Sequence, residues 1–313
     1  MSDEDIINVK TRILTVLSNL DDAELDAVEH WISSQSYKKE LLKMRALEKT
    51  ETYLRKIAAA IKKLVPFEAE LPSESIALPS VGDQANCTKV NTCHIDEFLY
   101  DDEQVEQLVK KGKLKRQYCC DCNSRNIKDL IFVSHSMSIN ALHYIFKVLL
   151  PMDLDGKQLL DVGSRFGSVI FAAYHLTNAS TIIGVEMNKE CCEIQEHIKN
   201  SFSMDSNRIK ILNSDITERK DIIQTSNIII INVLDFFVDC KKHKSMWYFF
   251  KDNIKKGSYI IANRSMPETL QGLDIYEDFI QWLSICKPSQ IENEILFDLE
   301  DFDNSTLYIY IVN

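Results

Sequence analysis

Residues 159–174 read LLDVGSRFGSVIFAAY and carry the most informative pattern in this chain of 313 residues. Apolar residues of strand length lead to Asp161, a turn with Gly163 and Gly167 follows, and the next apolar run has helical length. Glycine lets a backbone approach a ligand closely, and the βα turn at the carboxyl edge of a parallel sheet is where open α/β folds bind ligands. The pattern therefore predicts a strand, a ligand-binding turn and a helix.

Two further acids stand at the ends of the strands expected next along the chain. The second strand ends in Gly184-Val185-Glu186, and the third leads into Asn213-Ser214-Asp215. An acid at the end of the second strand is placed to accept hydrogen bonds from ribose hydroxyls. Because the carboxyl ends of parallel strands share one edge of a sheet, we expect Asp161 and these two acids to gather there.

Strand-like and helical segments alternate along residues 131–313. We expect strands at 158–162, 181–186, 208–212, 227–234, 258–263, 294–299 and 306–312, and helices at 139–149, 169–177, 189–202 and 244–254. Such alternation is typical of βαβ units and a parallel sheet. The acidic turn at 300–305 is too short for a crossover, so the last two strands form a hairpin and one of them runs antiparallel to the sheet.

This combination resembles the class I S-adenosylmethionine (SAM)-dependent methyltransferases over about residues 134–313. That family has an Asp-x-Gly-x-Gly loop, an acid ending each of strands two and three, and seven strands with the last antiparallel. The resemblance implies an α/β, Rossmann-like seven-stranded sheet and an enzyme that uses SAM. Gly163 and its neighbours would line the methionine end, Glu186 would hold the ribose and Asp215 would lie near the adenine. The implied cofactor-binding residues are Ser134, His135, Asp161, Gly163, Ser164, Arg165, Gly167, Glu186, Asp215 and Asn232.

Within the superfamily the motifs are nearest those of the non-SET histone-lysine methyltransferases. Asp161-Val162-Gly163-Ser164 resembles their DLGSG-type loop, and residues 231–237, INVLDFF, resemble their NN-aromatic element. The chain also resembles a group of uncharacterised methyltransferase-like proteins with a CxxC segment ahead of the SAM domain.

Two positions depart from the family pattern. Arg165 stands where the loop has its middle glycine, and only Asn232 stands where two asparagines are expected. The Arg165 side chain could crowd the methionine, or its guanidinium could pair with the SAM carboxylate. The alternative to an active enzyme is therefore a catalytically inactive SAM-binding or scaffolding protein with a zinc-bearing interaction module. A Rossmann dehydrogenase is disfavoured because GSRFG lacks the G-x-G-x-x-G spacing.

Asn232 and Asp235, near the end of the fourth strand, are the catalytic candidates. A nitrogen nucleophile must lose a proton, so hydrogen-bond acceptors close to it help, although Asp235 could equally cap a helix. Ser134 and His135 belong to the segment 132–138, FVSHSMS, which in this superfamily often closes over SAM. No Asn/Asp-Pro-Pro-aromatic element, typical of base-amino methylation, follows strand four. A protein lysine or another amine, RNA and a small molecule all remain as methyl acceptors, and we favour the protein amine slightly over RNA.

Cys119 and Cys122 form a CxxC turn in a chain that has nine cysteines. Such a turn presents two thiolates to one ion, and Cys93 and His94, about 25 residues upstream, could complete a tetrahedral zinc site. The alternative is a set of reduced, partly buried cysteines, since thiols stay reduced inside cells.

The expected organisation is a helical region at 1–65, a linker at 66–79, a small Cys/His segment at 80–130 and the methyltransferase domain at 131–313. The composition, 45% hydrophobic and 27% charged, is globular. The N-terminus has no signal peptide, and no apolar run reaches the roughly 18 residues of a membrane helix. We therefore expect a cytoplasmic or nuclear protein that does not contact a membrane, and leave its oligomeric state open.

The net charge of −11 disfavours attraction of the whole protein to nucleic acid. Basic residues nevertheless gather on the helix expected at 38–63. They would either meet an anionic partner or form a solvated helix face.

Overall fold

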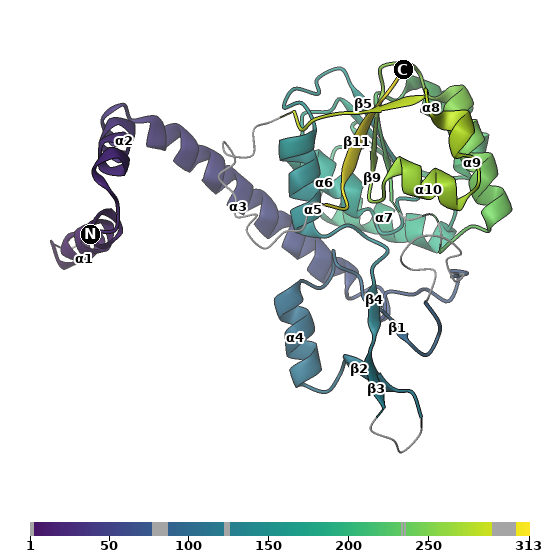
Figure 1. Ribbon diagram of the computed structural model, residues 1–313, viewed down its shortest axis with the longest axis horizontal. Helices are drawn as coiled ribbons and strands as arrows, with labels where there is room; N and C mark the ends of the chain where they lie inside the picture. Colours follow the sequence, from purple (N-terminus) through teal and green to yellow (C-terminus); the bar gives the residue numbers. More distant parts are fainter. Residues whose placement is uncertain (1–2, 77–86, 122–125, 233, 235, 290–304) are drawn as a thin grey trace. The chain divides into compact units, whose positions relative to one another are not determined.

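The computed structural model describes residues 3–76, 87–121, 126–232, 234, 236–289 and 305–313 (Figure 1). The chain divides into two compact units, Met1–Lys49 and Thr50–Asn313. This division falls inside helix α3 (Ser36–Ile61). The reason is burial, because Leu54, Ile57 and Ile61 of that helix each have 0% of their area exposed. No helix within the described ranges is long and apolar enough to cross a membrane.

The first unit consists of helices, as the apolar spacing predicted. They are α1 (Asp3–Leu17), α2 (Asp22–Ser33) and the first part of α3 (Ser36–Ile61). Asp21 caps α2, because its side chain accepts the Glu24 N–H at 2.9 Å while the Glu24 carboxylate accepts the Asp21 N–H at 2.9 Å. This reciprocal capping box satisfies two backbone donors at the start of the helix.

The second unit is built on one seven-stranded sheet in the order β10-β11-β9-β8-β5-β6-β7. Its strands are β5 (Gln158–Val162), β6 (Thr181–Glu186), β7 (Ile209–Asn213), β8 (Ile228–Ile231), β9 (Tyr259–Ala262), β10 (Leu283–Ile285) and β11 (Tyr308–Val312). Strands β5 to β9 pair in parallel, and β11 runs antiparallel to both β9 and β10. The predicted Rossmann-like α/β sheet with an antiparallel strand is thus confirmed.

The sheet differs from the prediction at its edge. The strand expected at 294–299 lies outside the described residues, and the place beside β11 is taken by β10 instead. The short run Leu283-Ser284-Ile285 is partly exposed, so it lacks the long apolar pattern that marked the inner strands.

Helices cover both faces of the sheet (Figure 1). On one side lie α5 (Ile139–Tyr144), η2 (Ile145–Leu149), α6 (Ser168–Leu176) and α7 (Lys189–Ser201). On the other lie η3 (Ile216–Glu218), α8 (Lys220–Thr225), α9 (Cys240–Asn253), α10 (Met266–Gly272) and η4 (Tyr276–Phe279). Trp247 and Phe250 of α9 belong to one buried cluster with alternate residues of β5 and β6. Their burial is the core packing expected where a layer of helices covers one face of a sheet.

The segment between α3 and the sheet contains short elements. They are β1 (Thr92–His94), α4 (Asp102–Lys110), β2 (Gln117–Cys119), β3 (Ile127–Asp129) and β4 (Ile131–Val133). Strand β1 pairs in parallel with β4, and β2 forms an antiparallel pair with β3. Arg55 pairs with Asp101 at 2.5 Å, and the Lys62 ammonium donates to Gln104 at 2.7 Å. Two basic side chains of the 38–63 helix are therefore engaged within the chain.

Candidate functional site

A cavity of about 780 Å³ opens at the carboxyl ends of β5, β6 and β8. Strand β5 lies between β6 and β8, so the chain leaves β5 for one side of the sheet and later returns to the other. Such a switch point is the general ligand site of open α/β sheets. The residues that line the cavity include Glu74, His135, Val162, Gly163, Arg165, Val185, Glu186, Lys189, Glu190, Glu193, Ile216, Asn232, Leu234, Phe237 and Met246.

The turn after β5 is held close to β6 by backbone hydrogen bonds. The Gly163 amide donates to the Val185 carbonyl at 2.9 Å, and the residue has a φ of 75°. A Cβ at Gly163 would meet no atom within 4 Å, because this position faces the open cavity. Gly167 differs, because its Cβ would come within 2.7 Å of the Phe171 ring. Gly163 therefore lies at the ligand site, whereas Gly167 allows the first turn of α6 to pack.

Two residues behind the turn hold its shape. Ser164 is buried and donates to the Gln195 side-chain oxygen at 3.1 Å, and the Gln195 amide donates to the Arg165 carbonyl at 2.6 Å. Ser164, a predicted cofactor-binding residue, is not among the residues that line the cavity. Gln195 of α7 was not predicted to take part, and its only signal in the sequence is a polar side chain on the apolar face of a helix.

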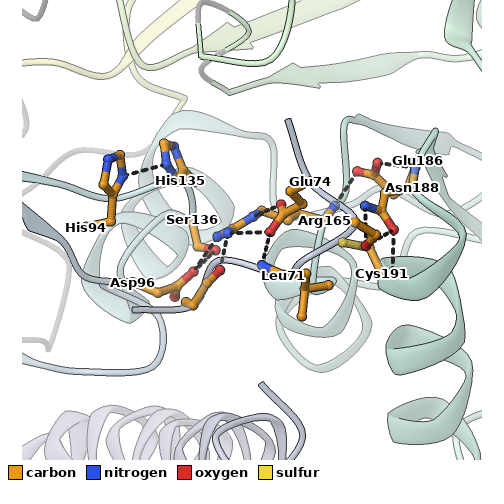
Figure 2. A network of polar contacts seen from close by, with 12 residues as sticks. Leu71, Glu74, His94, Asp96, His135, Ser136, Arg165, Glu186, Asn188 and Cys191 are labelled. Atoms are coloured by element: carbon orange, nitrogen blue, oxygen red, sulfur yellow. Dashed lines mark hydrogen bonds and ion pairs between the residues drawn. The ribbon is translucent and has the colours of Figure 1, made fainter. Parts of the chain in front are cut away.

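Arg165 adopts a left-handed backbone, with a φ of 42°, at the position where the family has glycine. Its guanidinium donates from Nε to Glu74 Oε1 at 2.8 Å and from Nη1 to Asp96 Oδ2 at 3.2 Å, and it also donates to the Ala69 carbonyl. Figure 2 shows Arg165 between these two carboxylates. The guanidinium is therefore engaged in a buried set of contacts with Ala69, Glu74 and Asp96. The side chain joins the cavity wall without closing the cavity.

Glu186, at the end of β6, presents its carboxylate to the same cavity. Its two oxygens accept the Arg165 and Asn188 backbone amides at 2.9 and 2.8 Å. Burial raises the pKa of Glu186, and these two hydrogen bonds oppose that rise. The carboxylate is therefore fixed in direction, and each oxygen retains a second lone pair to accept a hydroxyl proton.

The other two strand-end acids lie outside the lining of the cavity. Asp161 is buried within β5, and this burial, with the neighbouring Glu186 carboxylate, raises the pKa of Asp161 to about 8. Asp215 caps η3 through the Thr217 N–H at 2.8 Å and pairs with Lys242 at 2.5 Å. Burial alone would raise the pKa of Asp215, but the hydrogen bonds from Lys242 and Thr217 outweigh it and lower the pKa.

Asn232 and His135 meet at the cavity wall. The Asn232 amide donates to the His135 carbonyl at 3.2 Å, and both residues line the cavity. Ser134 instead holds the turn, since its hydroxyl accepts the Glu97 amide at 2.9 Å and donates to the Ser136 carbonyl at 2.7 Å. Asp235, the second catalytic candidate, lies outside the described residues.

The predicted zinc site is not supported. Among the described residues, no group of three or more His, Cys, Asp or Glu side chains is arranged to hold a metal ion. Cys93 and His94 lie on β1, where His94 contacts His135 at 3.0 Å, while Cys119 lies on β2, which pairs with β3. Cys122 lies outside the described residues.

Comparison with known proteins finds no matching family model and no matching curated protein. Solved structures of methyltransferases do match, at low identity. A SAM-dependent O-methyltransferase from Thermotoga maritima is 14% identical, with a TM-score of 0.40, and the match covers 57% of this chain and 66% of that one. A precorrin-6y C5,15-methyltransferase from Geobacter metallireducens is 13% identical, with a TM-score of 0.39 and coverages of 57% and 90%. An RNA methyltransferase from Salinibacter ruber, solved with S-adenosylhomocysteine (SAH), is 12% identical, with a TM-score of 0.33 and coverages of 55% and 86%. These likenesses concern the fold alone.

Proposed function

We propose that this protein is a SAM-dependent methyltransferase whose cofactor binds in the cavity at the carboxyl edge of β5, β6 and β8. One observation carries the proposal: Gly163 of the turn and Glu186 at the end of β6 line the same cavity of about 780 Å³. A volume of this size is typical of small-molecule and cofactor sites.

The lining residues fit the parts of SAM. The open space beside Gly163 suits the methionine end, and the fixed Glu186 carboxylate suits the ribose hydroxyls. Apolar side chains of Ile216, Leu234 and Met246 offer a surface for the adenine ring. Asp215 would act on this wall indirectly, by shaping the turn that carries Ile216.

SAM supplies a methyl group activated by its positively charged sulfur. The chain's own residues would orient the two reactants and exclude water, which accounts for much of the acceleration in such a displacement. Asn232 donates its amide to the His135 carbonyl, so its side-chain oxygen is the atom available to accept a hydrogen bond from an acceptor. Asp235 remains a proposed neighbour of the acceptor on sequence grounds.

A protein lysine or another amine is the proposed acceptor, ahead of RNA. Four carboxylates line the cavity, from Glu74, Glu186, Glu190 and Glu193. This charge attracts a cationic amine and repels a polyanion.

The alternative function is a SAM-binding protein without catalysis. The observation that favours it is Arg165, whose side chain ties the turn to residues 69–96 where an active family member has glycine. Methyl transfer by the wild-type protein that Glu186→Ala weakens would exclude this alternative.

Calorimetric titration with SAM and SAH tests the proposal. The wild-type protein should bind both, and Glu186→Ala should weaken binding by about tenfold or more, because hydrogen bonds to charged groups are worth about 1.5–3 kcal/mol. Glu103→Ala is a matched control, since it removes an exposed glutamate of α4 that is not among the residues lining the cavity. A folded wild-type protein that binds neither compound would overturn the proposal.

A further inference from the structure

His135 is a buried histidine with one ring nitrogen unused. It lines the cavity and is 8% exposed. Its Nδ1 atom is buried and has no hydrogen-bond partner among the residues that the structure describes. A buried polar atom without a partner costs free energy, and at a cavity wall it indicates a group that awaits a ligand.

The other ring nitrogen of His135 begins a chain of contacts that leads out of the cavity. Nε2 lies 3.0 Å from Nδ1 of His94, and Nε2 of His94 lies 3.5 Å from Oε1 of Glu70. The exposed fraction of the side chain rises from 19% at His94 to 41% at Glu70. Figure 2 shows the first of these contacts, with the two imidazoles facing each other. A continuous polar path thus joins the cavity to solvent.

The His135 ring is held in one orientation. It makes T-shaped contacts with the rings of Phe236 and Phe237, at centroid distances of 4.9 and 5.0 Å. It also stacks on the ring of His94, at a centroid distance of 5.0 Å. Its backbone carbonyl accepts the Asn232 amide. A group fixed in this way can present Nδ1 to a bound reactant without reorganising.

The charge around the cavity indicates which reactant would arrive there. Glu74, Glu186, Glu190 and Glu193 line the cavity, against Arg165 and Lys189. Glu74 and Asp96 neutralise Arg165, and Lys189 pairs with Glu193, so carboxylate charge is left over. A cationic acceptor is favoured over an anionic one.

We infer that His135 is the catalytic base for an amine acceptor of the lysine type, and that His94 and Glu70 are positioning residues that carry its proton to solvent. This inference rests on the proposed function. The ammonium loses a proton to His135 Nδ1, the Nε2 proton of His135 moves to His94 Nδ1, and the Nε2 proton of His94 moves to Glu70. The neutral amine then forms a bond to the methyl carbon as the methyl–sulfur bond breaks, and the electron pair stays on sulfur.

The protonation state of His135 is consistent with this role. Burial lowers its pKa well below 6.5, and the positive charge of Arg165 lowers it further. Burial also lowers the pKa of His94, against the raising effect of Glu70. Both rings are therefore neutral at physiological pH, so each has one nitrogen that accepts and one that donates.

Nuclear magnetic resonance of the protein with ¹⁵N-labelled histidine tests the arrangement without any acceptor. At pH 7, two-bond ¹H–¹⁵N correlations should show His135 protonated on Nε2 and unprotonated on Nδ1. His135→Gln identifies the signal. A His135 ring that carries its proton on Nδ1, or a charged ring, overturns the inference whatever the catalytic assays give.

Methyl transfer tests the chemistry. The probes are tritium-labelled SAM with an array of peptides that have a central lysine, the same array with central tyrosine, and mixed-sequence RNA. Lysine peptides should be methylated, and His135→Ala should lower kcat by about a hundredfold or more while the Kd for SAH stays within about threefold. Added imidazole should restore part of the loss, which a merely structural role would not allow.

His94→Gln and Glu70→Gln should lower kcat less than His135→Ala and leave KM unchanged. His175→Gln, in a half-buried histidine of α6, is the control and should match the wild type. Unchanged activity in His135→Ala overturns the relay. Methylation of tyrosine peptides or RNA alone, or of none of the probes by a protein that binds SAH, overturns the amine assignment. Failure of the wild type to bind SAH would instead refute the proposed function.

Discussion

The backbone amide of Arg165 lies 2.9 Å from Oε2 of Glu186, whereas the Arg165 guanidinium lies 2.8 Å from Glu74 on the N-terminal side of the chain. One residue therefore shapes the end of β6 with its backbone and fastens a distant segment with its side chain. This double role explains why an arginine stands in a turn whose backbone suits glycine.

Replacing Arg165 by glycine should destabilise the protein despite relieving the backbone. The side chains of Glu74 and Asp96 are 5% and 1% exposed, and removing their cation leaves buried charges unpaired, which costs about 3–5 kcal/mol. Glycine at a φ of 42° returns only about 1 kcal/mol. Urea unfolding at pH 7 should therefore show a net loss, and adding Glu74→Gln and Asp96→Asn should recover much of it. A variant Arg165→Gly as stable as the wild type would contradict this account.

The two glycines of the turn should respond differently to alanine. Gly163→Ala places a methyl group in open space, so stability should fall by only about 1 kcal/mol while the affinity for SAH drops. Gly167→Ala puts a methyl group 2.7 Å from the Phe171 ring, so its stability loss should be larger, about 2 kcal/mol or more. Thermal unfolding and calorimetry on the pair provide the comparison. Equal stability losses would refute the difference in packing.

Asp161 should make the folded protein less stable as the pH rises, whereas an ordinary paired carboxylate makes it more stable. Its pKa is raised from 3.8 to about 8, so the folded protein binds a proton that the unfolded chain releases. The contribution is complete below about pH 4 and is lost as the pH rises through about 8. Asp161→Asn should therefore gain stability relative to the wild type between pH 5 and pH 9.

Urea midpoints across that range measure the effect. Asp252→Asn removes an exposed carboxyl of α9, and its midpoints should run parallel to those of the wild type. The idea fails if Asp161→Asn also runs parallel.

Gln195→Ala should destabilise the protein, because Gln195 holds the turn after β5 from the side away from the cavity. Gln195 is 0% exposed, and its loss leaves the Arg165 carbonyl and the Ser164 hydroxyl without the partner they now share. An unsatisfied buried group costs about 1–3 kcal/mol. Chemical unfolding should reveal this loss, whereas the exposed control Gln107→Ala should change stability by less than about 0.5 kcal/mol. A negligible effect at Gln195 would mean that the turn is held by its backbone alone.

Much of the site was predictable because its elements are local in sequence. The strand, turn and acids of β5 and β6 follow one another within about 30 residues. The glycines also mark the turn directly in the sequence, because glycine is the residue that suits its backbone conformation. The antiparallel β11 was predicted, and the sheet contains it, but nearly all of the turn at 300–305 from which it was predicted lies outside the described residues. The edge partner of β11 was not predicted, because β10 is only three residues long and one of them, Ser284, is polar.

The partners of Arg165 could not be predicted in the same way. Glu74 and Asp96 lie 91 and 69 residues away, and periodicity contains no information about which distant side chains meet. His94 illustrates the same difficulty, because the sequence suggested partners for it that the fold does not bring together. Its spacing from Cys119 indicated a metal ligand, but β1 pairs with β4 and brings it to His135 instead.

The position of β11 has a consequence for how the protein is made. This strand, at Tyr308–Val312, lies between β9 and β10, although both precede it in sequence. While the ribosome is still translating the residues before it, β9 presents an unpaired edge, and such edges invite pairing with other chains. The sheet can close only after residues 308–312 have been synthesised, so the edge of β9 that β11 covers stays open until then.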